Sequence, residues 1–143
     1  MPHIFRHTLL LLMVVLSACQ SSTPQQSEAR QKDEAKAVTI LAKARTALYQ
    51  KRYNDAKKYL RSLRSTCPLA LNGRENGILL MDSIEIASTA DRLRVADSLV
   101  QDDMQRRGSV NAQTQAHFDE LCQQAKFYHR KLQHDKDQRK NHD

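Results

Sequence analysis

Apolar residues recur three and four positions apart over most of the chain, a spacing that places them on one face of an α-helix. The first such run begins near Glu28 and reaches Leu48, and the polar stretch Lys51–Asp55 then interrupts it. A second run starts at Ala56 and stops before Pro68, because proline cannot continue a helix and restricts the residue before it. The pattern therefore predicts two short helices that form a hairpin.

Two longer apolar stripes follow this predicted hairpin. A further helix begins near Leu71, and four of its apolar residues are seven apart: Leu79, Ile86, Leu93 and Val100. A second series four positions further on is weaker, and it consists of Ser83, Ala90, Asp97 and Met104. Such a broken heptad repeat is typical of helices that pack side by side.

The long third helix is expected to end at Gly108. Arg106 and Arg107 place cations at the negative end of the helix, and a glycine adopts the left-handed cap conformation easily. The next stripe runs from Phe118 to Leu132, again in steps of three and four. Two long stripes around a short turn predict an antiparallel, coiled-coil-like helical hairpin.

The composition agrees with an all-α fold. The chain has 143 residues with only three Gly, three Pro and no Trp, whereas helix-favouring residues are abundant. We expect one helical domain of four helices over residues 28–143, with a polar C-terminal tail. The formal charge of +7 fits a solvated helical surface, and an anionic partner is the alternative.

The first residues have the organisation of a secretion signal. Arg6 supplies a positive charge, and Leu9–Leu16 is an uninterrupted apolar run. A helix of that length rises only ~12 Å, so it cannot span a hydrocarbon core of ~30 Å. The length therefore favours a cleaved signal peptide over a permanent transmembrane anchor.

The end of this segment resembles the lipobox of bacterial lipoproteins, in which small residues precede a cysteine. The matching residues are Leu16, Ser17, Ala18 and Cys19. The resemblance implies that residues 1–18 are removed and that Cys19 receives diacylglycerol and an N-acyl chain. Two or more acyl chains hold a protein stably on a membrane. An ordinary secretion signal with a chance cysteine is the alternative.

The residues after Cys19 suggest where the domain resides. Gln20 in place of Asp resembles lipoproteins that are sorted to the outer membrane, so we expect the domain to face the periplasm. Residues 19–27 then comprise the lipidated cysteine and a polar, flexible tether.

The stretch from Tyr53 to Pro68 resembles the second half of a tetratricopeptide repeat. In such a repeat, small residues such as Ala44 and Ala56 let two helices approach closely. The chain departs from the pattern at Lys51, where the repeat usually has a turn glycine. One repeat cannot bury its own faces, so we expect the long hairpin to cover it.

A wider stretch is similar to a group of small helical lipoproteins of Bacteroidota. The matching residues are Ala56, Lys57, Leu60, Leu63, Pro68, Arg74, Gly77–Met81, Ile84–Ile86 and Asp97–Leu99. This resemblance implies the location and the fold, and it implies no activity.

The residues that could carry chemistry form no recognisable catalytic or metal-binding motif. Asp82, Glu85, Asp91 and Asp97 are spaced along what we expect to be the solvated flank of one helix. The candidate metal ligands are His117, His129, His134 and His142; of these, His129 and His134 are five apart and diverge on a helix. We therefore expect no enzyme, no metal and no small-molecule substrate.

Two further cysteines, Cys67 and Cys122, leave two alternatives open. In an oxidising periplasm they could form a disulfide between the first hairpin and the last helix. Otherwise they are two free thiols.

Tetratricopeptide-like domains bind peptides or helices, so the resemblance implies an interaction module for an envelope protein. Its candidate contact residues are Tyr49, Tyr53 and Arg74. The alternative is a structural envelope lipoprotein whose basic tail, Lys126–Asp143, contacts anionic lipid or cell-wall polymer. We expect no nucleic-acid partner, because a lipoprotein secreted from the cytoplasm seldom meets one.

Overall fold

The computed structural model describes residues 27–141, and this part of the chain is all-helical. Its elements are α2 (Glu28–Tyr49), α3 (Tyr53–Thr66), α4 (Leu71–Arg107) and α5 (Ala112–Lys140). The predicted all-α fold and its four helices are confirmed. The predicted cleavage segment Leu16–Ala18, the lipidation residue Cys19 and His142 lie outside the described residues.

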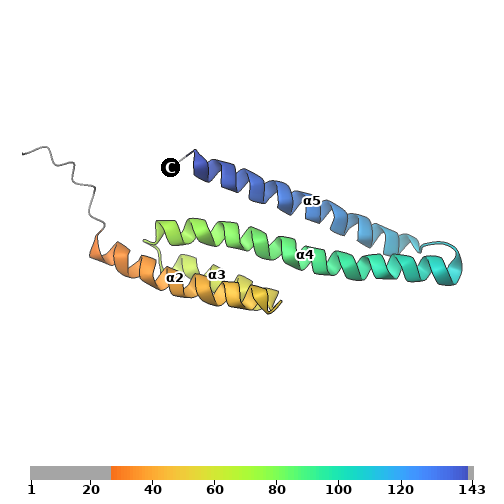
Figure 1. Cartoon of the computed structure of the whole chain (residues 1–143), viewed down its shortest axis with the longest axis horizontal. Helices are drawn as coiled ribbons and strands as arrows, with labels where there is room; N and C mark the ends of the chain where they lie inside the picture. Colours follow the sequence, from red (N-terminus) through yellow and green to blue (C-terminus); the bar gives the residue numbers. More distant parts are fainter. Residues whose placement is uncertain (1–26, 142–143) are drawn as a thin grey trace, which may run out of the picture.

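The longest helix, α4, is the spine of the molecule (Figure 1). The short hairpin α2–α3 packs along its first half, and α5 runs back antiparallel to it. Within the described chain, α5 packs on α4 and on no other helix. The second half of α4 and the start of α5 therefore extend beyond the short hairpin as a two-helix arm.

Local sequence determines several helix ends. The Ser27 hydroxyl accepts a hydrogen bond from the Arg30 N–H at 3.3 Å at the start of α2, and the Asn111 side chain caps α5 in the same way. At the end of α4, Gly108 has φ 72°, as the sequence predicts. Lys51, in the turn between α2 and α3, has φ 57° although it is not a glycine.

The start of α4 is capped by side chains from α2. Its N-cap residue, Ala70, offers no side-chain acceptor. Instead, the Glu34 carboxylate accepts hydrogen bonds from the Asn72 N–H at 3.0 Å and the Gly73 N–H at 2.9 Å. Asp33 likewise accepts from the Leu69 N–H at 3.0 Å. These bonds satisfy backbone groups that a helix start leaves without a partner, and they fix α2 against α4.

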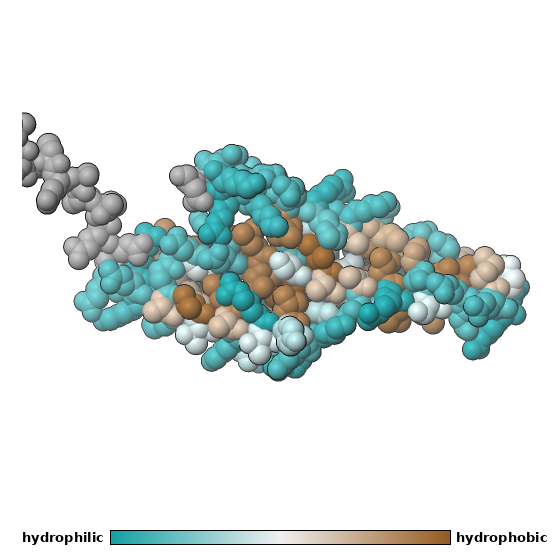
Figure 2. Space-filling view, viewed as in Figure 1, coloured by the Kyte–Doolittle hydropathy of each residue, from teal (hydrophilic) through white to brown (hydrophobic). Residues whose placement is uncertain are grey.

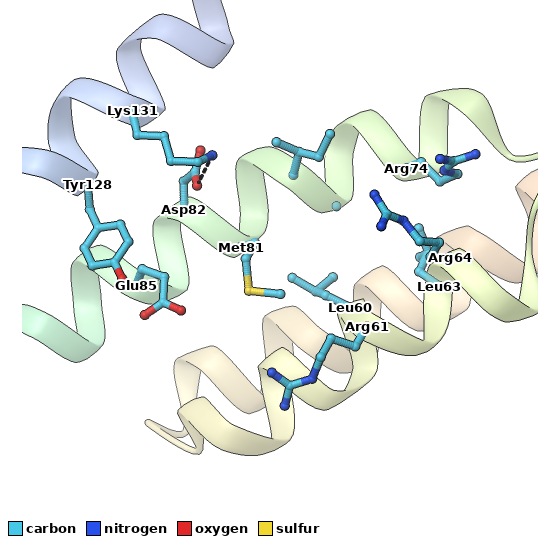
Figure 3. Close-up of a pocket in the computed structure, with 12 residues that line it drawn as sticks. Leu60, Arg61, Leu63, Arg64, Arg74, Met81, Asp82, Glu85, Tyr128 and Lys131 are labelled. Atoms are coloured by element: carbon cyan, nitrogen blue, oxygen red, sulfur yellow. Dashed lines mark hydrogen bonds and ion pairs between the residues drawn. The ribbon is translucent and has the colours of Figure 1, made fainter.

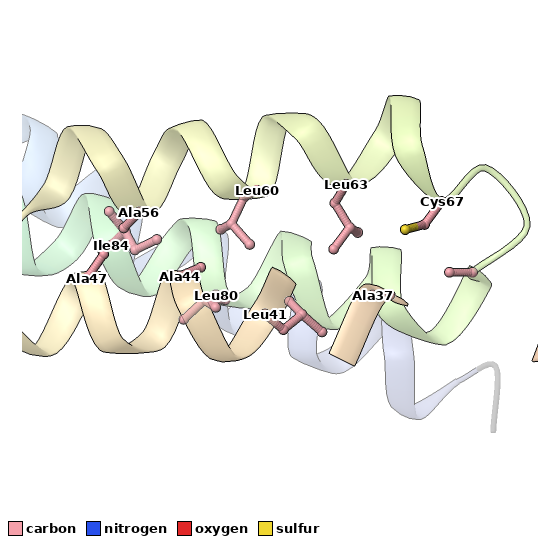
Figure 4. Close-up of a cluster of buried hydrophobic side chains, with 11 residues drawn as sticks. Ala37, Leu41, Ala44, Ala47, Ala56, Leu60, Leu63, Cys67, Leu80 and Ile84 are labelled. Atoms are coloured by element: carbon pink, nitrogen blue, oxygen red, sulfur yellow. The ribbon is translucent and has the colours of Figure 1, made fainter. Parts of the chain in front are cut away.

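The core lies between α2, α3 and the first half of α4 (Figure 4). Alanines fill much of it, which lets the helices approach closely: Ala37, Ala44, Ala47 and Ala56 are fully buried. Larger apolar residues, including Leu41, Leu63 and Ile84, close the remaining space. A Cβ on Gly73 would lie 2.4 Å from the Ala37 Cβ, so α2 and α4 approach each other closely at this glycine.

The structure corrects the predicted register of α4. The residues buried along the seam are Asp82, Thr89 and Ala96. Each lies three positions after a residue of the predicted heptad series, which are Leu79, Ile86 and Leu93. Ala90 and Met104, of the series four positions on, are exposed. Asp82 can lie in this seam because it accepts a hydrogen bond from Lys131 of α5.

The polar C-terminal segment belongs to α5, which remains helical to Lys140. Side-chain bonds one turn apart, such as Gln133 to Asp137, support it. Arg139 also donates a hydrogen bond to the Asn76 side chain at 2.7 Å, which ties this end of α5 to α4.

Candidate functional site: the groove between α3 and α5

A groove of about 450 Å³ runs along α4 between α3 and α5 (Figure 3). It exists because α3 and α5 both pack on α4 but do not contact each other. Its apolar lining comes from Leu60, Leu63, Ile78 and Met81, and Ile78 is 51% exposed. The groove therefore leaves apolar surface of the spine open to solvent.

Arginines occupy one end and the rim of this groove. Arg64 of α3 and Arg74 of α4 lie at the same end, and Arg61 lies further along α3 (Figure 3). Arg74 donates a hydrogen bond to the Pro68 carbonyl at 3.3 Å. None of the three pairs with a carboxylate of residues 27–141. This end consequently carries unbalanced positive charge.

At the other end the charges are paired. The Lys131 ammonium of α5 donates to Asp82 Oδ1 and to Asp135 Oδ2, each at 2.7 Å. Lys57 of α3 pairs with Glu85 of α4 at 2.6 Å. These two pairs link α4 to the helices on either side of it.

Asp82 is an unusual member of this cluster, because its side chain is only 3% exposed. Its second oxygen, Oδ2, is buried and has no hydrogen-bond partner within residues 27–141. Burial raises the pKa of Asp82, although Lys131 opposes this. For Lys131, burial lowers the pKa, but hydrogen bonds to Asp135 and Asp82 outweigh it, so the net shift is upward. The expectation that Asp82 lies on a solvated flank is therefore wrong, because α5 covers that side of α4.

The three predicted contact residues do not form one surface. Tyr49 is 90% exposed at the end of α2, and Tyr53 lies across the same turn. Arg74 lies near the opposite end of the short hairpin, and of the three it alone lines the groove. The sequence thus identifies one arginine of the groove and misses Arg61, Arg64 and Lys131.

Tyr53, which the sequence predicts as a contact residue for a partner, is bonded within the fold. Its hydroxyl donates a hydrogen bond to Asp91 Oδ2 at 2.6 Å, and Lys51 pairs with the same carboxylate at 3.1 Å. These bonds lower the pKa of Asp91, and the carboxylate in turn raises the pKa of Tyr53. The cluster holds the turn between α2 and α3 on the middle of α4.

The two cysteines are free thiols in the structure. Cys67 is buried just before α4, whereas Cys122 lies on α5 near the level of Arg92, which donates to Gln124. The length of α4 from Leu71 to Arg92 is roughly 32 Å. A disulfide requires Cα atoms within about 7 Å, so this fold does not bring the two cysteines together.

Within residues 27–141, no group of three or more His, Cys, Asp and Glu side chains is placed to hold a metal ion. The same region contains no helix that is both long and apolar enough to cross a membrane. Comparisons with protein-family models, with curated proteins and with solved structures find no match.

Proposed function

We propose that this protein is a lipid-anchored, non-enzymatic module of the cell envelope that binds another protein in the groove between α3 and α5. The observation that carries this proposal is the groove itself, with exposed apolar surface on α4 and arginines that have no carboxylate partner within residues 27–141. Apolar residues with a few charged groups at the edge are the usual make-up of a protein-binding surface.

The ion pairs of the groove support a binding role over a catalytic one. Asp82 and Glu85 both accept a hydrogen bond from a lysine of a neighbouring helix. Such pairs fix the distances between helices, whereas a general base needs a free carboxylate within reach of a substrate proton.

The membrane anchor is the part of the proposal that rests on sequence alone. Its test is a Cys19→Ser variant produced in the native bacterium. We expect the wild-type protein to incorporate radiolabelled palmitate and to sediment with the outer membrane, and the variant to do neither. Equal sedimentation of the two proteins would contradict anchoring through Cys19.

Position-specific photo-crosslinking in cells tests the groove. A photoreactive residue at Met81 lies within the groove, and one at Val38, which is 65% exposed on α2, serves as the control. We expect one adduct of defined mass from position 81 and none from position 38. The proposal fails if both positions give the same adducts or if position 81 gives none.

A second candidate function is contact with anionic lipid or cell-wall polymer. It is favoured by Lys126, Arg130 and Lys136 on α5, for which residues 27–141 provide no carboxylate partner. Truncation of this helix would also remove the contacts of Lys131 and Arg139, so charge reversal is the cleaner test. If Lys126→Glu with Arg130→Glu leaves the salt-dependent binding to anionic vesicles unchanged, this candidate is excluded.

A further inference from the structure

We infer that the partner segment is an amphipathic helix whose acidic residues lie against Arg64 and Arg74. This inference rests on the proposed function and specifies the chemistry of the partner. Two features of the groove carry it: its shape and its unbalanced charge.

The shape of the groove suits a helix. Along α4 it extends from Arg74 to Glu85, which is ~16 Å or about three helical turns. Helices pack ~8–10 Å apart, and an unoccupied position on α4 remains between α3 and α5 because these two helices do not touch. A partner helix there would use apolar residues at i, i+3 and i+7 to cover Ile78 and Met81.

The charge of the groove selects an acidic partner. Both carboxylates of the groove already have a lysine partner, whereas Arg61, Arg64 and Arg74 have no carboxylate partner in the described chain. Guanidinium groups bind carboxylates through two parallel hydrogen bonds, which adds both energy and orientation. Glutamates at one end of the partner helix would provide these bonds.

The groove on the other side of α5 lacks this unbalanced charge. It lies between α2 and α5, and on that face apolar side chains form a band along α4 (Figure 2). Its lining contains two arginines, Arg30 and Arg139, and two carboxylates, Glu75 and Asp135, so its charges balance. The argument for an acidic helix therefore applies to the groove beside α3.

A lipid is the less suitable occupant. An anionic headgroup would also satisfy the arginines, but the groove is open along its length. An acyl chain lying in it would keep much of its surface in water, which is unfavourable in proportion to the exposed area. A helix instead turns its polar face outward.

Two synthetic helical peptides test the inference against the full-length protein. One carries three leucines at i, i+3 and i+7 and two glutamates at one end; the other has lysines in place of the glutamates. We expect the acidic peptide to bind at least roughly tenfold more tightly in fluorescence anisotropy.

Charge reversal on α3 provides the decisive comparison. We expect the double variant Arg61→Glu with Arg64→Glu to bind the acidic peptide roughly tenfold more weakly than the wild type does. The same variant should bind the lysine peptide more tightly. Lys58→Glu, an exposed α3 position outside the groove, should change neither affinity. Circular dichroism establishes that the variants are folded. Equal binding of the two peptides, or an equal response to both sets of substitutions, overturns the inference.

Vesicles of phosphatidylglycerol and phosphatidylethanolamine test the lipid alternative with the same variants. Vesicle binding that requires Arg61 and Arg64, together with failure of the acidic peptide, would overturn the inference in favour of lipid. If the acidic peptide fails but a crosslinker at Met81 still captures one protein, the inference is wrong and the proposed function stands. If both fail, both are wrong.

Discussion

Lys51 holds a backbone conformation that normally suits glycine. Its φ of 57° lies in the left-handed region, where a side chain costs roughly 1–2 kcal/mol. Its ammonium group pairs with Asp91 at 3.1 Å, and this partly exposed pair offsets some of that cost. The lysine therefore strains the backbone of the turn, and its side chain links that turn to α4.

Two substitutions at this position separate the strain from the ion pair. Lys51→Ala removes the pair and keeps the strain, whereas Lys51→Gly removes both. We expect the glycine variant to be more stable than the alanine variant by about 1 kcal/mol in urea denaturation. Equal stabilities would mean that the left-handed turn is not strained.

The Tyr53 hydroxyl should control the ionisation of Asp91. Because its hydrogen bond is the main cause of the low pKa of Asp91, Tyr53→Phe should raise this pKa, as measured by NMR titration of the carboxyl carbon. Tyr49→Phe is the matched control, since Tyr49 is exposed and makes no such bond. A similar Asp91 titration in both variants would contradict this account.

At the scale of elements, some helix ends follow from local sequence and others do not. Pro68 and Gly108 act through their own backbones, so the ends they produce can be predicted from neighbouring residues. The start of α4 depends on Asp33 and Glu34, more than thirty residues earlier in the chain. No local pattern reveals such a cap, because it forms only when α2 lies beside α4.

The sequence predicts the wrong register for the α4–α5 seam for a related reason. A hydrophobic pattern favours Ala90 and Met104 over Asp82 and Thr89 as seam residues. Asp82 is nevertheless buried, because Lys131 approaches it from α5. Burial of a polar residue depends on its partner, and a single helix contains no information about that partner.

The two glycines of α4 should respond oppositely to alanine. At Gly73 a Cβ would lie 2.4 Å from the Ala37 Cβ, so the helices must separate, and we expect a loss of roughly 1–3 kcal/mol. At Gly77 the nearest atom is 3.5 Å away, an ordinary contact, and alanine should stabilise the helix by about 0.5–1 kcal/mol. Thermal unfolding measures both changes, and destabilisation by Gly77→Ala would contradict this view of the packing.

At the scale of the whole molecule, the groove could not be predicted. It depends on the position of α5 relative to α3, two helices that do not contact each other. Only a family resemblance points to Arg74, and the arginines on α3 look like ordinary surface charges in the sequence. Their significance comes from the absence of a carboxylate opposite them within residues 27–141.

The buried carboxyl of Asp82 should make stability depend on pH in an uncommon direction. Its pKa is higher in the folded chain than the ordinary 3.8, so the folded state binds the proton more tightly. The contribution to stability is then full at low pH and declines as pH rises through 3.8 towards the folded value. The advantage of wild type over Asp82→Asn should shrink across that interval in urea unfolding.

Asp91 provides a control of opposite sign. Its pKa is lowered in the folded chain, so its contribution is present above 3.8 and is lost as pH falls. The advantage of wild type over Asp91→Asn should therefore grow as pH rises. Parallel pH dependences for the two variants would refute the assignment of Asp82 as the desolvated group.

Because α5 packs on α4 and on neither of the other described helices, it should open more often than they do. A helix that shares no core with α2 or α3 can separate from the molecule while the rest stays folded. In native-state hydrogen exchange, the amides of α5 should exchange together and before those of α2 and α3. Each such opening also removes one wall of the groove, so the lifetime of a bound segment would be limited by how often α5 leaves.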